Sequence, residues 1–292
     1  MKHVKSILFG SIAALGLSSG FASAADMYAP AACGTVMVGA QGEYHFDRGY
    51  DDDTYGYGIG VFGKATEFCG WAGDGTAMQF DVYGSAVQAR NGAFGGYDGA
   101  EAGTVAHLFY RDQYWAYGAL FGIGLLNESY EDYTEGFVLP LGLDLVYYAS
   151  HDWTLAAQGV YWWSPGQTDS SENPDWAWQV TGEARFFWDE NTRVDLLAGY
   201  HQNRDNESDY TYYAALVGAG IEHKFMNNWS VFANYEGQFG HMYGDTFNQH
   251  AFNVGFIYQM GTDTLLQRDR TGATFATPTL DPYTNLRLNY ER

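Results

Sequence analysis

The chain has 292 residues, with 35 acidic and 14 basic side chains, and its formal net charge is −21 at pH 7. Aromatic residues make up 18% of it and Gly occurs 37 times, yet its mean hydropathy is slightly negative, at −0.30. This composition excludes nucleic acid as a partner, because nucleic-acid binding needs basic clusters, and it does not match the Leu- and Ile-rich core of a soluble protein.

The N-terminal segment has the features of a secretory signal peptide. Lys2 and Lys5 precede an apolar run over 7–17, and the small residues 22–24 have the form of a signal-peptidase site. The run is too short to cross a bilayer as a helix, which takes about twenty residues. We therefore expect residues 1–24 to be removed on export, and an uncleaved anchor is the alternative.

The two cysteines lie close together in the expected topology. Cys33 comes just before the first expected strand, and Cys69 follows the second. Pairing of these strands brings both residues to one end, and an exported protein meets an oxidising compartment. A Cys33–Cys69 disulfide is expected, with two free thiols as the alternative. No metal site and no cofactor are expected, because no His or Cys lies nearby at ligand spacing.

From Thr35 onward, apolar or small residues alternate with polar ones, which is the period of a β-strand. In the clearest segment Leu141 and Leu143 share one parity, whereas Asp144 falls on the other. A leucine face of this kind needs no second protein layer if lipid covers it. Twelve segments are expected, at 35–46, 54–66, 77–90, 102–111, 114–127, 136–149, 153–164, 176–188, 192–203, 210–225, 229–241 and 250–261.

This pattern predicts an all-β fold: a closed, antiparallel, up-and-down transmembrane β-barrel of about 12 strands. An even number keeps both ends on one side of the membrane. Ten and fourteen strands are the alternatives, because 68–76 is a long connection for its place.

The connections between the segments alternate in length, and this fixes the orientation. Short ones lie at 111–113, 150–152, 189–192 and 226–228. Longer, acidic ones lie at 47–53, 91–99, 128–135, 167–175, 203–209 and 242–249. In such barrels short turns face the periplasm and long loops face outside. The acidic loop residues 51–53 are candidates for divalent cations that bridge lipopolysaccharide, although simple solvation is the favoured interpretation.

Aromatic residues gather in two bands, as expected for the two membrane interfaces. The band at the short turns contains Phe109, Tyr110, Tyr114, Trp115, Tyr147, Tyr148, Trp153, Phe187, Trp188, Phe225 and Trp229. The band toward the loops contains Tyr161, Trp162, Trp163, Trp178, Tyr200, Tyr210, Tyr212 and Phe239.

The signal peptide, the alternating strands and the aromatic bands together resemble Gram-negative outer-membrane β-barrel proteins of the porin-like kind. In the last strand Asn253, Gly255, Tyr258 and Met260 resemble the C-terminal signal that the barrel-assembly machinery reads. The resemblance implies an outer-membrane location, with outer-membrane lipid, lipopolysaccharide and the assembly machinery as partners. It departs from the usual pattern because that signal normally ends the chain, whereas here 262–292 follows.

The expected domains are the signal peptide at 1–24, the barrel at 25–261 and a C-terminal extension at 262–292. The extension contains Pro278 and Pro282 and shows no sustained periodicity. A flexible periplasmic extension is the favoured interpretation. A plug in the barrel lumen or a cell-wall contact is the alternative.

The polar parity of the strands predicts the residues that line the lumen. They are the acids Glu43, Asp81, Asp144, Glu183, Asp195, Glu222 and Glu236, the bases Lys64, Arg185, Arg193 and Lys224, and His107. The excess of acids favours cations in a water-filled pore. The alternative is that the bases pair with Glu183, Asp195 and Glu222 in a network that partly closes the barrel, since buried charges need partners.

A passive, porin-like channel for small polar solutes, with a bias for cations, is the predicted function. A non-conducting structural or adhesive barrel is the first alternative. An outer-membrane hydrolase is the second, resting on His201, His241 and His250 with Asp205, Asp209 and Asp245 near the outer rim. No catalytic residue is assigned, because these spacings form no motif and Ser85 and His107 do not make a convincing nucleophile and base.

Overall fold

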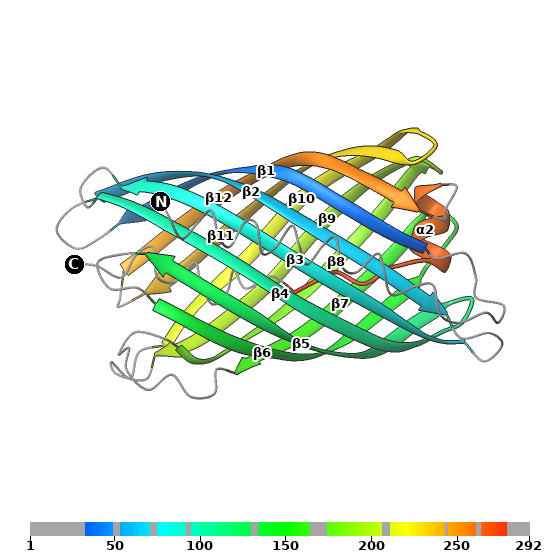
Figure 1. Cartoon of the computed structure of the whole chain (residues 1–292), viewed down its shortest axis with the longest axis horizontal. Helices are drawn as coiled ribbons and strands as arrows, with labels where there is room; N and C mark the ends of the chain where they lie inside the picture. Colours follow the sequence, from blue (N-terminus) through cyan, green and yellow to red (C-terminus); the bar gives the residue numbers. More distant parts are fainter. Residues whose placement is uncertain are drawn as a thin grey trace.

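The computed structural model describes residues 33–48, 53–70, 75–91, 95–129, 134–163, 174–205, 211–242, 245–260 and 264–278. Twelve strands and one short helix lie in these ranges (Figure 1). The strands are β1 (Cys33–Arg48), β2 (Asp53–Gly70), β3 (Thr76–Asn91), β4 (Gly95–Arg111), β5 (Trp115–Ser129), β6 (Thr134–Tyr148), β7 (Trp153–Trp163), β8 (Pro174–Asp189), β9 (Thr192–Asp205), β10 (Thr211–Met226), β11 (Trp229–Met242) and β12 (Asp245–Met260). Within these ranges no helix is long and apolar enough to cross a membrane.

Each strand pairs antiparallel with the next one along the chain, and β1 pairs with β12 to close the sheet. At the closing seam Gln41 lies opposite Asn253. The closure leaves no open edge, so the wall satisfies its own backbone hydrogen bonds within a bilayer. The predicted antiparallel barrel of twelve strands is confirmed.

The strands are longer than the periodicity alone indicated, mainly at the loop end of the barrel. β4 begins at Gly95 rather than near 102, and β12 begins at Asp245 rather than near 250. A tilted strand crosses the hydrocarbon with about 9–11 residues, whereas these strands have 11–18. The backbone ladder therefore continues beyond the bilayer, where no lipid imposes an apolar face and the alternation fades.

The wall sorts its side chains by parity as predicted. In β6, Leu141 and Leu143 are 52% and 69% exposed on the outer face, whereas Asp144 and Val146 are buried on the inner face. At the short-turn end, exposed Trp115 packs on Tyr147 with ring centroids 4.4 Å apart. These rings stand on the outer face, where amphipathic aromatics suit the interface.

Among the expected band residues whose side chains the structure describes, four face the lumen instead. Phe109, Tyr148, Trp162 and Phe187 are all less than 9% exposed, and they belong to the inward parity of their strands. In the sequence these four residues stand next to rings that face outward. The aromatic pattern therefore indicates their position along the strand, but it does not indicate which face of the strand they occupy. They fill the barrel interior as packing groups.

The C-terminal segment enters the barrel at the short-turn end. Helix α2 (Leu265–Thr271) lies at this end, and residues 272–278 run inside the wall (Figure 1). For 264–278 this corrects the expectation of a flexible periplasmic extension and agrees with the lumenal alternative. We call residues 264–278 the tail; residues 279–292 and the signal segment 1–24 lie outside the described residues.

Candidate functional site

The predicted lumen residues lie on the inward parity wherever their side chains are described. The buried ones are Asp81, His107, Asp144, Arg185, Glu222 and Lys224, and the half-buried ones are Lys64, Glu183, Arg193, Asp195 and Glu236. The side chain of Glu43 lies outside the described residues, although its strand position is on the same parity. That solute passes along these groups stays a prediction.

A first polar group joins β2, β3, β4 and β6. His107 Nδ1 lies 2.7 Å from an Asp144 oxygen, and its Nε2 lies 3.3 Å from an Asp81 oxygen. Lys64 Nζ is 3.8 Å from the same oxygen of Asp81. These side chains therefore link the four strands on the lumen side of the wall, because His107 contacts both carboxylates and Asp81 contacts both His107 and Lys64.

A second group lies on β8, β9 and β10. Arg185 Nη2 donates to Glu183 at 2.6 Å, and Arg193 Nε lies 2.8 Å from an Asp195 oxygen. Arg193 also lies 3.5 Å from Glu222. These arginines are therefore paired with carboxylates, which is the arrangement of the alternative interpretation. Charges with so little exposure need partners of this kind.

The tail supplies the remaining partners of this network. Arg268 donates two hydrogen bonds to Glu222, at 2.9 and 2.5 Å. Arg185 Nη1 donates to Asp269 at 2.8 Å, and the Thr154 hydroxyl donates to Asp269 at 2.6 Å. Sequence reasoning missed Arg268 and Asp269 because the tail was placed outside. The one local indication of a helix in this segment of the sequence was Thr264. Its side chain caps α2 by accepting a hydrogen bond from the backbone N–H of Gln267.

Asp269 is held in its ionised form by these contacts. Burial by itself opposes ionisation, but the charge of Arg185 and the Thr154 hydrogen bond outweigh it, so the pKa of Asp269 lies below its ordinary value of 3.8. The carboxylate is consequently available as an anchor for the tail at neutral pH.

Beyond α2, the tail packs an aromatic ring into the lumen. Phe275 stacks on His107, with centroids 5.6 Å apart, and meets Phe109 edge-on at 4.7 Å. It belongs to a buried cluster with Phe68, Ala77, Phe109, Ala116, Val146 and Tyr148. The tail thereby joins the inner wall through apolar contacts as well as ion pairs.

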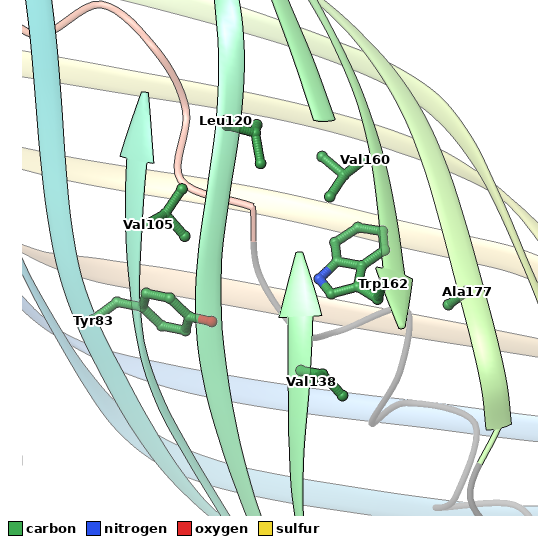
Figure 2. Close-up of a cluster of buried hydrophobic side chains, with 7 residues drawn as sticks. All are labelled: Tyr83, Val105, Leu120, Val138, Val160, Trp162 and Ala177. Carbon is green, nitrogen blue, oxygen red and sulfur yellow. The ribbon is translucent and has the colours of Figure 1, made fainter. Parts of the chain in front are cut away.

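The inner wall carries an apolar patch farther toward the loop end, on β3 to β8. Figure 2 shows its side chains, which are Tyr83, Val105, Leu120, Val138, Val160, Trp162 and Ala177. Each of them lies on the parity that was expected to be polar. The lumen lining is therefore not uniformly polar.

The inward side chains of the opposite wall, on β11, β12 and β1, are mixed, because buried Phe232, Phe247 and Ile257 stand there beside polar groups. Asn234 is exposed on the inward parity, and Gln41, Glu236 and Asn253 are half-buried there. The tail does not fill the short-turn half either, because a small cavity of about 40 Å³ lies beside it, lined by residues of β6 to β9 and by Thr274 to Ala276. The lumen therefore has an apolar patch on β3 to β8, and exposed or half-buried polar groups on β11, β12 and β1.

The histidines of the hydrolase alternative do not converge. His201 is buried on the inward parity with no hydrogen bond to either ring nitrogen, whereas His250 accepts or donates a bond with the Tyr235 hydroxyl on the outer parity. His241 is on the outer parity as well, against the ring of Tyr213. Ser85 donates to Glu101 and not to a histidine. The side chains of the three aspartates lie outside the described residues.

The register places Cys33 opposite Phe68, one position from Cys69. The side chains of both cysteines lie outside the described residues, so the disulfide stays a prediction. The divalent-cation candidates at 51–53 fall outside them in the same way.

No protein-family model and no curated protein matches the chain. Solved structures do match it at 11% identity. The COG4313 outer membrane channel from Pseudomonas putida F1 aligns over 79% of this chain and 96% of its own, with a TM-score of 0.65. The translocator domain of the autotransporter NalP from Neisseria meningitidis aligns over 88% and 97%, with a TM-score of 0.53. The likeness shows the fold and confirms the resemblance to outer-membrane β-barrel proteins.

Proposed function

We propose that the protein is an outer-membrane channel through which small polar solutes pass passively, with a preference for cations. The export signal expected at 1–24 and the lipid-facing outer parity support this location. One of the structures that share the fold is itself named an outer membrane channel.

The polar inward side chains of β11, β12 and β1 are the observation that carries the proposal. Asn234 is exposed although it points into a closed barrel, and its cross-strand partner Asn253 has a buried amide oxygen without a hydrogen bond. Such groups suit a wall that water and polar solutes contact. Twelve strands fall between eight, which side chains fill, and sixteen, which leave an open channel.

The preference for cations follows from where the charges lie. Arg185, Arg193 and Arg268 are neutralised by carboxylates at the short-turn end. Toward the loops, Glu101 and Glu236 are half-buried on the inward parity. Carboxylates beside a solute path attract cations and repel anions.

The second candidate is a barrel that does not conduct in its resting state. The tail favours it, because α2 and 272–278 occupy the short-turn half. Ion pairs and the Phe275 cluster hold them there.

Planar-bilayer recording of the purified full chain separates the two. The channel proposal predicts stepwise currents and a reversal potential on the cation side in a salt gradient. Glu236→Gln should lower the cation preference, whereas Glu67→Gln, the same charge change on the outer parity, should leave it unchanged. Persistent silence of the full chain and of a chain that ends at Met260, both inserted as folded barrels, rejects the channel.

A further inference from the structure

The extended part of the tail is held mainly by its backbone. Gln79 binds both polar groups of one peptide residue: its side-chain N–H donates to the Phe275 carbonyl at 2.8 Å, and its carbonyl accepts from the Phe275 N–H at 3.1 Å. A buried amide side chain that faces a peptide group in this way satisfies a donor and an acceptor at once. Gln79 has no exposed surface.

Three further inward side chains each donate to a backbone carbonyl of the tail at 2.8 Å. The pairs are Arg111 with Gly272, Arg185 with Thr274, and Gln158 with Ala276. Together with Gln79, these donors come from β3, β4, β7 and β8. They bind Gly272, Thr274, Phe275 and Ala276, which belong to one short segment that runs inside the wall (Figure 1).

Recognition through the backbone places little demand on most side chains of the bound segment, and pockets then supply the selectivity. One pocket is formed by His107 and Phe109 and takes Phe275. A second contact is the Thr277 hydroxyl, which donates to Asp81 at 2.5 Å. The Ala276 side chain is exposed. Residues 272–278, Gly-Ala-Thr-Phe-Ala-Thr-Pro, carry no charge.

We propose that the short-turn half of the lumen is a peptide-binding site for extended, uncharged segments with one aromatic residue between small ones. Residues 272–278 occupy this site in the resting protein, and α2 keeps them at high local concentration through Arg268 and Asp269. A free peptide of the same kind exchanges with the tail once the covalent link to β12 is cut. This binding function goes beyond the proposed channel and does not depend on conductance.

The test uses the full chain, folded in detergent micelles, with a specific protease site inserted between Met260 and Thr264. After cleavage, a fluorescent peptide with the sequence of 264–278 is added. Its binding is followed by anisotropy, and the native tail left on the barrel is measured by mass spectrometry. Saturable binding that releases the native tail supports the site.

Three changes to the peptide test the specificity of the site. The peptide with Phe275→Ala should bind about tenfold or more weakly, because it loses the buried ring. The peptide with Ala276→Ser, which alters the exposed neighbour, should bind like the unmodified one. N-methylation of the Phe275 nitrogen, which removes the donor to Gln79, should also weaken binding.

The proposal is overturned if the cleaved tail does not exchange even in large excess of peptide. It is equally overturned if cleavage unfolds the barrel, since the tail is then an integral part of the wall, or if the Phe275→Ala peptide binds like the unmodified one. A barrel that exchanges peptide but never conducts rejects the channel alone, and a barrel that conducts without exchange rejects this site alone.

Discussion

Arg268 in α2 and Glu222 in β10 form a two-point ion pair in which both side chains are almost fully buried. Glu222 also accepts from Ser230 at 2.6 Å and lies near Arg193. A residue of the tail is thereby part of the polar interior of the wall. The closure of the short-turn end and the stability of the barrel are linked through this contact.

Removing Arg268 should release the tail and destabilise the barrel. Arg268→Ala leaves Glu222 buried without its strongest partner, and breaking a buried pair from one side costs about 3–5 kcal/mol. Urea unfolding in detergent measures the loss, and protease sensitivity near α2 reports the tail. The double variant Arg268→Met with Glu222→Met should recover most of the stability, because it leaves no unpaired charge. If the single variant unfolds like the unmodified protein, the pair does not anchor the tail.

The anchoring of the tail should weaken in acid through Asp269. The pKa of this carboxyl is below 3.8 when the tail is docked, so the ionised form favours docking. The contribution is complete above about pH 4 to 5 and falls as the pH drops below 3.8 toward the docked pKa. Asp269→Asn should dock more weakly at pH 7 and show a flatter pH dependence. Hydrogen exchange of 264–278 between pH 3 and 7 measures this, and identical profiles for the two proteins would contradict it.

The two faces of the wall should tolerate charge very differently. Leu143→Arg places a charge on the outer parity and should cost about 2–4 kcal/mol near the bilayer midplane. Asn234→Arg places the same charge at an exposed position of the inner face and should cost less than about 1 kcal/mol. Urea titration of folding into lipid vesicles compares them. Equal costs would mean that the outer parity does not meet hydrocarbon.

Shortening Phe275 should loosen the tail without breaking the barrel. Phe275→Ala removes a ring that fills a cluster in the lumen, at a cost of about 3–5 kcal/mol if the cavity does not collapse. Cleavage of the tail by a protease should become faster, whereas the strand content measured by circular dichroism should not change. Val146→Ala, in the same cluster but on the wall, should destabilise the barrel without selectively exposing the tail.

The strands and their outward faces could be predicted because lipid imposes a local rule: every second side chain must be apolar. Leu141 and Leu143 obey it within a few residues of sequence. The inner face follows no such rule. Val160 and Trp162 stand on the parity that was expected to be polar, because packing inside the lumen satisfies them as well as lipid does.

The site at the short-turn end could not be predicted for a different reason. Its contacts join residues far apart in the chain, such as Gln79 and Phe275, which are 196 positions apart. A helix of seven residues leaves no periodicity to detect. The pairing of Glu183, Asp195 and Glu222 with bases was anticipated as an alternative. The tail residues Arg268 and Asp269, which pair with Glu222 and Arg185, could not be predicted because they meet the wall only when the chain returns into the barrel.

The position of the tail inside a closed barrel is tested most directly by crosslinking. In a chain with Cys33→Ser and Cys69→Ser, the pair Thr277→Cys and Asp81→Cys brings a thiol of the tail next to a thiol of the inner wall, since the native side chains are 2.5 Å apart. A short bismaleimide should join them in the folded protein and shift its mobility after protease cleavage between Met260 and Thr264. The pair Thr277→Cys and Leu143→Cys, with one thiol on the outer face, should not be joined. Crosslinking of the second pair, or failure of the first in a barrel that resists unfolding in detergent, would contradict a tail held within the lumen.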